Sequence, residues 1–122
     1  MSTVGPGTVE QVRRYYERVD AGELDGMLAL FTPDVVYDRP GYPVMRGRDA
    51  LAEFYGGQRV ISSGTHTLEQ VTAEESVVAV HGEFAGVLKD GSEAKLRFAD
   101  FFTLAADGLI SRRITFFHAP VV

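Results

Sequence analysis

The feature that most constrains the fold of this chain is a run of four β-rich stretches in its C-terminal half. They cover residues 65–72, 77–88, 93–104 and 109–119. The breaks between them contain Glu74-Glu75, Asp90-Gly91 and Asp107-Gly108. Because Asp-Gly pairs between β-rich segments are typical of hairpin turns, consecutive stretches are predicted to pair antiparallel in one sheet.

The N-terminal half has helical patterns instead. Residues 8–11 fit a capping box at the start of a predicted helix over about 8–21. A second, shorter helix is predicted to end at Thr32-Pro33, and a third at Gly56-Gly57. The helical segments therefore precede the long strands along the chain.

Helices followed by an antiparallel sheet predict an α+β fold, with the helices packed on one face of a curved sheet. Such a sheet leaves a concave space at its open end, so we expect a cone-shaped, mainly antiparallel barrel that encloses an apolar pocket. The 122 residues suffice for one domain with a sizeable core. We therefore expect a single domain over 1–122, with a flexible start at 1–7.

Composition and charge exclude several classes of function. The net charge is −5 and the Lys and Arg residues form no basic block, which argues against nucleic-acid binding. The chain contains no Cys and therefore no disulfide or thiolate metal site. No apolar stretch is long enough to span a bilayer, and the first residues lack the regions of a secretory signal. We expect a cytoplasmic protein without a membrane partner.

Asp100 lies in an apolar strand pattern. Alternation puts its carboxyl on the same face as Phe98 and Phe102, whereas Lys95 and Arg97 lie on the opposite, more polar face. A buried carboxylate must find strong hydrogen bonds or a cation, or else stay protonated and act as a hydrogen-bond donor. Asp100 is therefore a candidate catalytic residue, and the alternative is a structural acid bonded to the backbone or to a neighbour.

Two further residues are candidates for proton chemistry. Asp38 ends a predicted strand over 35–38, just before a loop rich in Pro and Gly, where it could act as a general base or simply form a local Asx-turn. Tyr15 and Tyr16 are adjacent on the first helix, so their side chains diverge by about 100° and at most one faces a cavity squarely. Packing in the core is the alternative role for such a tyrosine.

The three histidines, His66, His81 and His118, lie on different predicted strands. Their spacing is not that of metal ligands, and no Cys or paired-carboxylate cluster supports them, so we expect no metal site. His81 or His118 could instead line a pocket and act as an acid or a base.

Four segments together carry a resemblance to a known family. They are residues 14–20 (RYYERVD), 36–40 (VYDRP), 46–55 (RGRDALAEFY) and 98–102 (FADFF). In these segments, which span nearly the whole chain, the sequence resembles the ketosteroid isomerases and the wider SnoaL-like, nuclear transport factor 2-like superfamily. The resemblance implies a cone-shaped α+β barrel with a deep apolar pocket.

The resemblance also implies roles for single residues. By position, Asp38 would be the base, Tyr15 the phenolic donor and Asp100 a neutral acid, with Tyr55 supporting the phenol of Tyr15. In the isomerases a proline directly follows the base, whereas here Arg39 does. Unless it points to solvent, this cation would favour the ionised form of Asp38 and weaken it as a base.

The expected function is that of a cofactor-free isomerase, which abstracts a proton next to a carbonyl of a hydrophobic small molecule and stabilises the enolate. Two alternatives remain open: a polyketide cyclase or epoxide-opening hydrolase or cyclase, and a non-catalytic ligand-binding or dimerisation domain. A homodimer is expected through the convex sheet face, with Phe101 or Phe117 as apolar contacts. The residues expected to bind substrate are Tyr55, Phe54, Phe98, Phe102, Phe116, His81 and His118.

Overall fold

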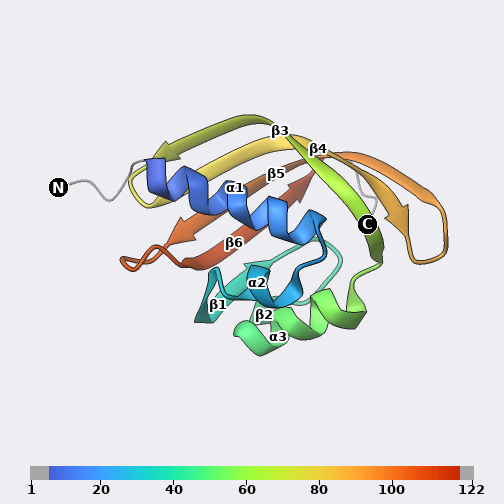
Figure 1. Cartoon of the computed structure of the whole chain (residues 1–122), viewed down its shortest axis with the longest axis horizontal. Coiled ribbons are helices and arrows are strands. Elements are labelled where there is room, and N and C mark those ends of the chain that lie inside the picture. Colours follow the sequence, from blue (N-terminus) through green and yellow to red (C-terminus); the bar gives the residue numbers. More distant parts are fainter. Residues whose placement is uncertain (1–5, 119–122) are drawn as a thin grey trace.

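The computed structural model describes residues 6–118. Three α-helices, α1 (Pro6–Asp20), α2 (Leu24–Leu28) and α3 (Arg48–Glu53), are followed by a π-helical turn, η1 (Phe54–Gln58). Six strands complete the fold (Figure 1): β1 (Phe31–Asp38), β2 (Met45–Arg46), β3 (Ile61–Glu74), β4 (Val77–Leu88), β5 (Glu93–Leu104) and β6 (Ile110–Phe117). Of the segment 1–7 that was expected to be flexible, residues 1–5 lie outside the described part, and α1 already includes Pro6 and Gly7.

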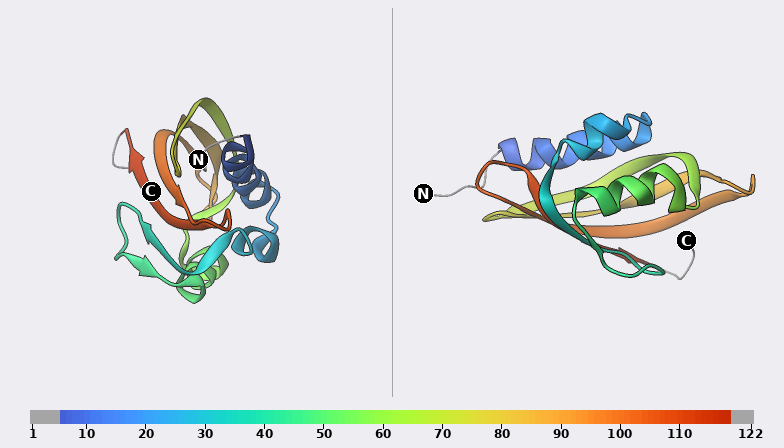
Figure 2. Two further views of the ribbon diagram at one scale, coloured as in Figure 1. Left: turned by 90° about the vertical axis from the view of Figure 1, so that its left-hand side faces the viewer. Right: turned by 90° about the horizontal axis from the view of Figure 1, so that it is seen from below.

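The strands form one sheet in the order β2-β1-β6-β5-β4-β3. All neighbouring pairs are antiparallel except β1 and β6, which run parallel. The sheet is strongly curved, and α1 lies across its concave side (Figure 2). The predicted α+β fold is confirmed, although the sheet itself stays open between its two edge strands, β2 and β3.

The four β-rich stretches were predicted well. Strands β4 and β5 have the predicted bounds, β3 begins four residues earlier, at Ile61, and β6 covers Ile110–Phe117. Gly91 and Gly108 have φ angles of 89° and 87°, the left-handed conformation that Asp-Gly turns require. The Asx-type bonds of these turns are present, since Asp90 and Asp107 accept hydrogen bonds from backbone N–H groups two residues on.

The first strand differs from the prediction. Helix α2 ends at Leu28, and β1 begins at Phe31, so Thr32-Pro33 lies inside the strand instead of ending a helix. The register of β1 against β6 shifts between Phe31 and Val36, and this irregularity accommodates a proline that cannot donate to a regular ladder. Strand β2 was not predicted, because two residues give no periodic signal.

Close approach of β3 and β4 explains two glycines. A Cβ atom at Gly82 would lie 2.3 Å from the carbonyl oxygen of Thr67, and one at Gly86 would lie 2.2 Å from that of Ser63. Both contacts are next to register shifts in β3. Glycine at these positions therefore permits the bend with which β3 curls over the end of α1.

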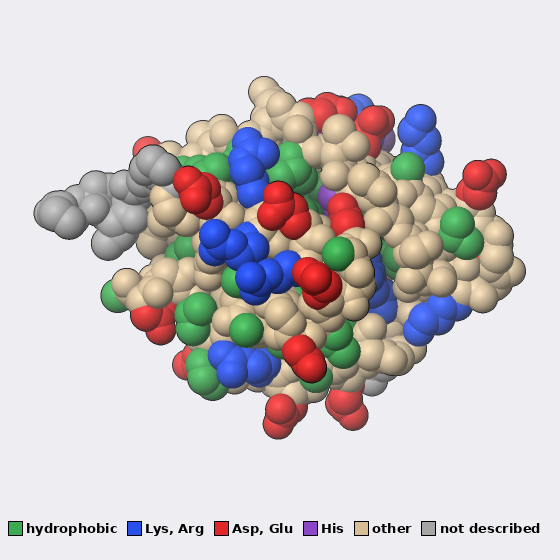
Figure 3. Space-filling model, viewed as in Figure 1, with side chains coloured by type: hydrophobic (Ala, Val, Ile, Leu, Met, Phe, Trp, Pro, Cys, Tyr) green, Lys and Arg blue, Asp and Glu red, His purple; other side chains and the backbone are tan. Residues whose placement is uncertain are grey.

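The core lies between α1 and the concave side of the sheet. Val12, Tyr15 and Tyr16 are the buried face of α1, and the core also contains the polar residues Asp100 and Arg113. On the outer surface of the helices, Arg side chains lie among Asp and Glu side chains (Figure 3). Among the described residues, no helix has the length and apolar character needed to cross a bilayer.

Candidate functional site

A buried ion pair joins β5 and β6 at the centre of the core. The carboxylate of Asp100 has no exposed surface, and Arg113 is 4% exposed. Nη2 of Arg113 lies 2.9 Å from Oδ2 of Asp100, and Nε lies 3.2 Å from Oδ1, so the guanidinium binds both carboxylate oxygens. The expected burial of Asp100 is confirmed, and its partner is a cation that the sequence did not identify.

Asp100 is ionised, which corrects the expectation of a neutral acid. Burial alone would raise the pKa of this carboxyl, but the charge and hydrogen bonds of Arg113, with further bonds from Thr115 and Tyr16, hold the pKa below its usual value. Both hydroxyl groups donate directly to the carboxylate. Because every bond is made to the charged form, Asp100 accepts hydrogen bonds here and has no proton to donate.

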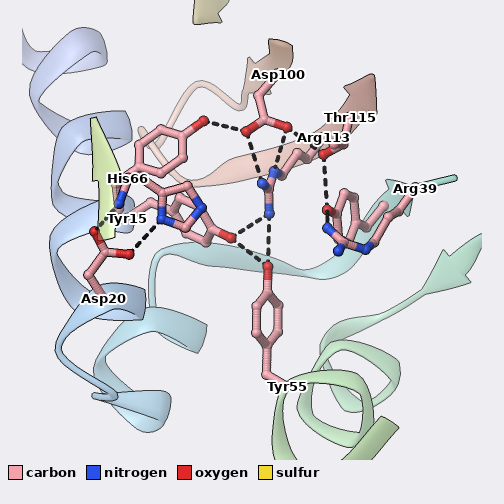
Figure 4. Close-up of polar contacts among 10 residues, drawn as sticks. Tyr15, Asp20, Arg39, Tyr55, His66, Asp100, Arg113 and Thr115 are labelled. Atoms are coloured by element: carbon pink, nitrogen blue, oxygen red, sulfur yellow. Dashed lines mark hydrogen bonds and ion pairs between the residues drawn. The ribbon is translucent and has the colours of Figure 1, made fainter. Parts of the chain in front are cut away.

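The far side of Arg113 holds a pair of phenols (Figure 4). Nη1 donates to the hydroxyl of Tyr15 and, at 2.8 Å, to that of Tyr55, and the two hydroxyl oxygens are 2.5 Å apart. One phenolic hydrogen makes the bond between them. The second is left free to donate elsewhere, because both phenol oxygens already accept from Arg113. Burial raises the pKa of Tyr15 well above its ordinary value, although Arg113 opposes this, so the phenol stays protonated.

The two tyrosines of α1 have different partners. Tyr16, and not Tyr15 as expected, bonds to Asp100, while Tyr15 lies on the other side of the guanidinium. The contact between Tyr55 and Tyr15 that the resemblance implies is present. Tyr55 reaches it from the π-helical turn η1, whose extra residue per turn alters the direction of its side chain.

Asp38 does not share the site, contrary to expectation. Tyr37 in β1 and Arg39, just after the strand ends, are buried, and Asp38 between them is exposed. Tyr37 is fixed inward by a 2.9 Å bond to Thr115 on β6. The parallel pairing of β1 with β6 thus determines which face of β1 is buried, and a short strand predicted from 35–38 alone did not reveal it.

Two neighbouring spaces at the site share part of their lining. An inner cavity of about 20 Å³ adjoins an outer cleft of about 370 Å³, and Tyr55, Arg59 and Ile61 line both. The inner cavity is large enough for one small group of a ligand, while the outer cleft holds a larger body. The side chains around the inner cavity are those of Tyr15, Arg39, Tyr55, Arg59, Ile61, His66, Phe84, Leu96, Phe98, Arg113, Thr115 and Phe117.

Only Tyr55 and Phe98 of the expected substrate-binding residues line this cavity. Phe54 and Phe102 are fully buried in the core behind it. The remaining three, Phe116, His81 and His118, line a separate groove of about 200 Å³ that Phe98 and Phe117 also border. On β6 the inward residues are Arg113, Thr115 and Phe117, so the predicted face of this strand was wrong by one residue.

A histidine with a carboxylate partner forms another wall of the inner cavity. Nδ1 of His66, on β3, lies 2.5 Å from Oδ1 of Asp20 at the end of α1. The backbone N–H of His66 donates to Oδ2 of the same carboxylate over 2.8 Å. The ring packs among Tyr16, Phe84 and Phe98, with centroids 4.8 to 5.4 Å away.

The carboxylate at Nδ1 favours one tautomer of a neutral His66. In that tautomer Nδ1–H donates to Asp20 and Nε2 carries the lone pair. The ring nitrogen that does not face Asp20 points to the side of the cavity where Tyr15 and Arg113 lie (Figure 4). No role in a pocket was predicted for His66. Alternation nevertheless puts it on one face of β3 with Leu68, which packs against the core, and this pattern could have identified it.

Arg39 also faces the cavity and so neither points to solvent nor approaches Asp38. It is 6% exposed, and its guanidinium lies between the rings of Tyr42, Phe54 and Phe117. Nη1 donates to the hydroxyl of Tyr37 over 3.2 Å. Within residues 6–118, no three His, Asp or Glu side chains are grouped as a metal site would require.

Comparison of the chain with known proteins identifies its family and other structures with the same fold. The sequence model of the SnoaL-like domain family matches residues 12–113. No curated protein matches the chain.

Many solved structures have the same fold. One is SalBIII, an epoxide hydrolase/cyclase-like enzyme described in pyran ring formation in the polyether salinomycin (23% identity, TM-score 0.81, 90% of this chain and 89% of that one). A second, from Jannaschia sp. CCS1, is provisionally assigned as a SnoaL-like polyketide cyclase (21% identity, TM-score 0.81, 97% of this chain and 90% of that one). A third, from Kribbella flavida DSM 17836, is provisionally assigned as a ketosteroid isomerase (23% identity, TM-score 0.76, 95% of this chain and 81% of that one). At these identities the likeness shows a shared fold.

Proposed function

The chain belongs to the SnoaL-like domain family, and on that premise we propose that it is an enzyme that removes a proton from a carbon next to a carbonyl and stabilises the enolate. Its substrate is a hydrophobic small molecule. The observation that carries the proposal is that a histidine held by a carboxylate, His66, and a phenol pair held by a guanidinium, Tyr15 and Tyr55, line the same inner cavity.

His66 is the general base of this proposal. Asp20 orients the ring and stabilises the imidazolium that forms when Nε2 takes a proton. The aromatic rings of Tyr16, Phe84 and Phe98 surround the imidazole and limit its contact with water. A base in such surroundings can reach a weakly acidic C–H bond without competition from solvent.

The phenol pair is the proposed donor to the carbonyl oxygen. As the C–H bond breaks, its electron pair moves into the C–C bond that forms the enolate, and negative charge grows on the oxygen. The free phenolic hydrogen of Tyr15 or Tyr55 donates to this oxygen, and Arg113 behind both phenols strengthens the bond. The proton on Nε2 then returns to the substrate, at another carbon of the conjugated system if the reaction is an isomerisation.

Asp100 is a positioning residue in this mechanism. It contacts Arg113, Tyr16 and Thr115, and it does not line the cavity. Its negative charge keeps the guanidinium in place and balances a cation that burial would otherwise make costly. The family resemblance implies that a neutral acid donates a hydrogen bond to the enolate oxygen. In this proposal the phenols of Tyr15 and Tyr55 make that bond instead.

Epoxide opening or cyclisation is the second candidate. The same His66 could take the proton of a hydroxyl group as the oxygen of that group bonds to an epoxide carbon. The C–O bond at this carbon breaks, and the phenol that binds the released oxygen gives it a proton, while the proton on Nε2 is returned to the phenol through solvent. The observation that favours it is that base and donor face one cavity, an arrangement that either reaction needs. The shared fold with SalBIII agrees with this candidate.

Solvent deuterium exchange tests the first candidate. β-Tetralone and steroid enones are incubated in D₂O with the wild-type protein, His66→Asn and the matched variant His81→Asn, whose site lies on the outer face. We expect exchange at the α-carbon with the wild type and His81→Asn, and none above background with His66→Asn. Equal exchange by the wild type and His66→Asn would refute the role of His66. Opening of a terminal epoxide without any exchange would favour the second candidate, and binding without either reaction would indicate a non-catalytic domain.

We also propose that the protein is a homodimer through the outer face of the sheet. Phe101 and Phe116 are 43% and 54% exposed on neighbouring strands, and their rings pack edge to face with centroids 5.9 Å apart. An exposed aromatic pair on a sheet face is typical of a surface that a partner covers. Phe117, which was also expected there, lines the inner cavity and also borders the groove next to Phe116.

A further inference from the structure

Arg39 has hydrogen-bonding capacity that the described part of the protein does not use. Its side chain is 94% buried, and neither Nε nor Nη2 has a hydrogen-bond partner among residues 6–118. A buried guanidinium with two unpaired N–H groups is costly unless something accepts them. Since Arg39 lines the inner cavity, the acceptor that fits is a group of the bound ligand.

The charge of the cavity wall points to an anion. Among the described residues that line the inner cavity there are three arginines and no Asp or Glu. Arg113 is paired with Asp100 behind the wall, and Arg59 lies over the ring of Tyr55 at the mouth. Arg39 has no carboxylate within ion-pair distance in the described part of the chain, although the net charge of the protein is −5. Its positive charge is therefore left for the ligand.

The surroundings of Arg39 orient its guanidinium. Carbon Cζ lies 5.1 Å from the ring centroid of Phe117 and 5.3 Å from that of Phe54, and the bond from Nη1 to Tyr37 fixes one end of the group. The edge that carries Nε and Nη2 remains unbonded. Two parallel N–H groups on one planar edge match the two oxygens of a carboxylate.

We infer that Arg39 is a carboxylate-binding residue and that the substrate is an enolisable keto acid with a hydrophobic body. His66 and Arg39 lie on opposite sides of the Tyr55–Arg113 contact (Figure 4), so a carbonyl at the phenols would have its acidic C–H on one side and the carboxylate on the other. The outer cleft of about 370 Å³ takes the hydrophobic body, and the polar end, which is larger than the free space of about 20 Å³ in the inner cavity, must displace side chains of the cavity wall as it binds. The placing of the reacting carbon rests on the proposed function, but the binding of the carboxylate does not.

Binding of a matched pair of ligands tests the inference. Cinnamate and cinnamamide have the same apolar body and differ in charge, and neither has an enolisable carbon. Their affinities are measured by calorimetry at neutral pH for the wild type, Arg39→Gln and the control Arg112→Gln, which removes an exposed arginine of β6. We expect the wild type and Arg112→Gln to bind cinnamate at least about tenfold tighter than cinnamamide, and Arg39→Gln to bind both equally. Equal binding by the wild type, or a preference that survives in Arg39→Gln, would overturn the inference.

Further variants keep the test decisive. If thermal unfolding shows that Arg39→Gln is not folded, Arg39→Lys replaces it. This variant keeps the positive charge but loses the planar edge. Its ratio of cinnamate affinity to cinnamamide affinity is expected to fall to the square root of the wild-type ratio or below. An unchanged preference in Arg39→Lys would overturn the planar-edge argument and the inference with it. His66→Asn should retain the preference. A preference for cinnamate without deuterium exchange into any ketone refutes the proposed function alone, whereas exchange without the preference refutes this inference alone.

Discussion

Asp20 binds His66 at two points, since one carboxylate oxygen accepts from the backbone N–H and the other from the ring nitrogen Nδ1. The last residue of α1 and the middle of β3 are thereby joined at the wall of the cavity. The catalytic consequence is that the orientation of the imidazole depends on a residue 46 positions earlier in the chain.

Replacement of Asp20 by Asn should therefore impair catalysis more than binding. An amide in this place can donate to Nδ1 and would leave the proton on Nε2, which faces the cavity. We expect kcat for enolisation to fall by about 10²–10⁴-fold with little change in KM. Glu17→Gln, an exposed change on the same helix, is the control and should be normal. A normal kcat for Asp20→Asn would refute a role of the Asp20–His66 pair in catalysis.

Single losses in the phenol pair should be tolerated better than the double loss. In Tyr55→Phe, the hydroxyl of Tyr15 still accepts from Arg113 and its hydrogen remains free for the substrate, and the converse holds for Tyr15→Phe. We expect each single variant to lose about tenfold or less in kcat, and the double variant to lose about 10²–10³-fold. Steady-state kinetics of the three variants measures the non-additivity. Equal losses in a single and the double variant would mean that one specific phenol is the donor.

Asp38→Asn should have almost no effect. The side chain is exposed and lies outside the residues that line the cavity. Surface changes of this kind usually alter free energies by less than about 0.5 kcal/mol, so turnover should stay within about twofold of the wild type. A loss of several orders of magnitude would restore the base that the family resemblance implies and would displace His66 from that role.

Asp100→Asn should destabilise the fold strongly. The substitution leaves the buried guanidinium of Arg113 without its counter-charge, and loss of one partner of a buried pair costs about 3–5 kcal/mol. Denaturant unfolding measures this change. The double variant Asp100→Asn/Arg113→Met removes both charges and should recover part of the loss. If the double variant is less stable than the single one, the cost comes from lost packing and not from an unpaired charge.

The same pair predicts how stability depends on pH. Burial opposes ionisation of Asp100, but Arg113 and the hydroxyl groups lower its pKa in the folded state below the value in the unfolded chain. The stabilisation is therefore complete above about pH 5 and is lost as the pH falls through the carboxylate range below about pH 4. The free energy of unfolding of the wild type should decline more steeply in this range than that of Asp100→Asn/Arg113→Met. Parallel curves would contradict the lowered pKa.

The outer-face aromatic pair can be tested by sedimentation. Phe116→Lys places a charge beside Phe101 and should shift a dimer of the wild type to a monomer. Val87→Lys, at another exposed apolar position, is the control and should remain dimeric. A monomeric wild type would refute the homodimer.

Much of the fold could be predicted because its signals are local. The Asp-Gly turns and the apolar alternation of residues 77–104 gave two strands with their observed bounds. The burial of Asp100 followed from the same alternation, since its neighbours on that face are large and apolar. Such patterns depend on nearby residues only, so one sequence suffices to recognise them.

The site was harder to predict because its partners are distant in the sequence. Arg113 meets Asp100 only through the register of β6 on β5, and Asp38 turns outward only because β1 pairs with β6 in parallel. A shift of one residue in either register exchanges the inward and outward faces, which is why Phe116 and His118 were predicted on the wrong side. Asp20 and His66 come together through the packing of α1 on β3, which no local pattern records.

The position of β6 in the sheet also has a consequence for the order in which the protein can form. Of the six strands in residues 6–118, this one is synthesised last, yet it lies between β1 and β5, near the middle of the sheet. Before it emerges from the ribosome, the β1–β2 pair and the β3–β4–β5 meander have no strand to join them, and Arg113 is not yet available to neutralise Asp100. Completion of the sheet and assembly of the pocket are thus the same late event, so a chain that ends before Ile110 should neither fold stably nor bind a ligand.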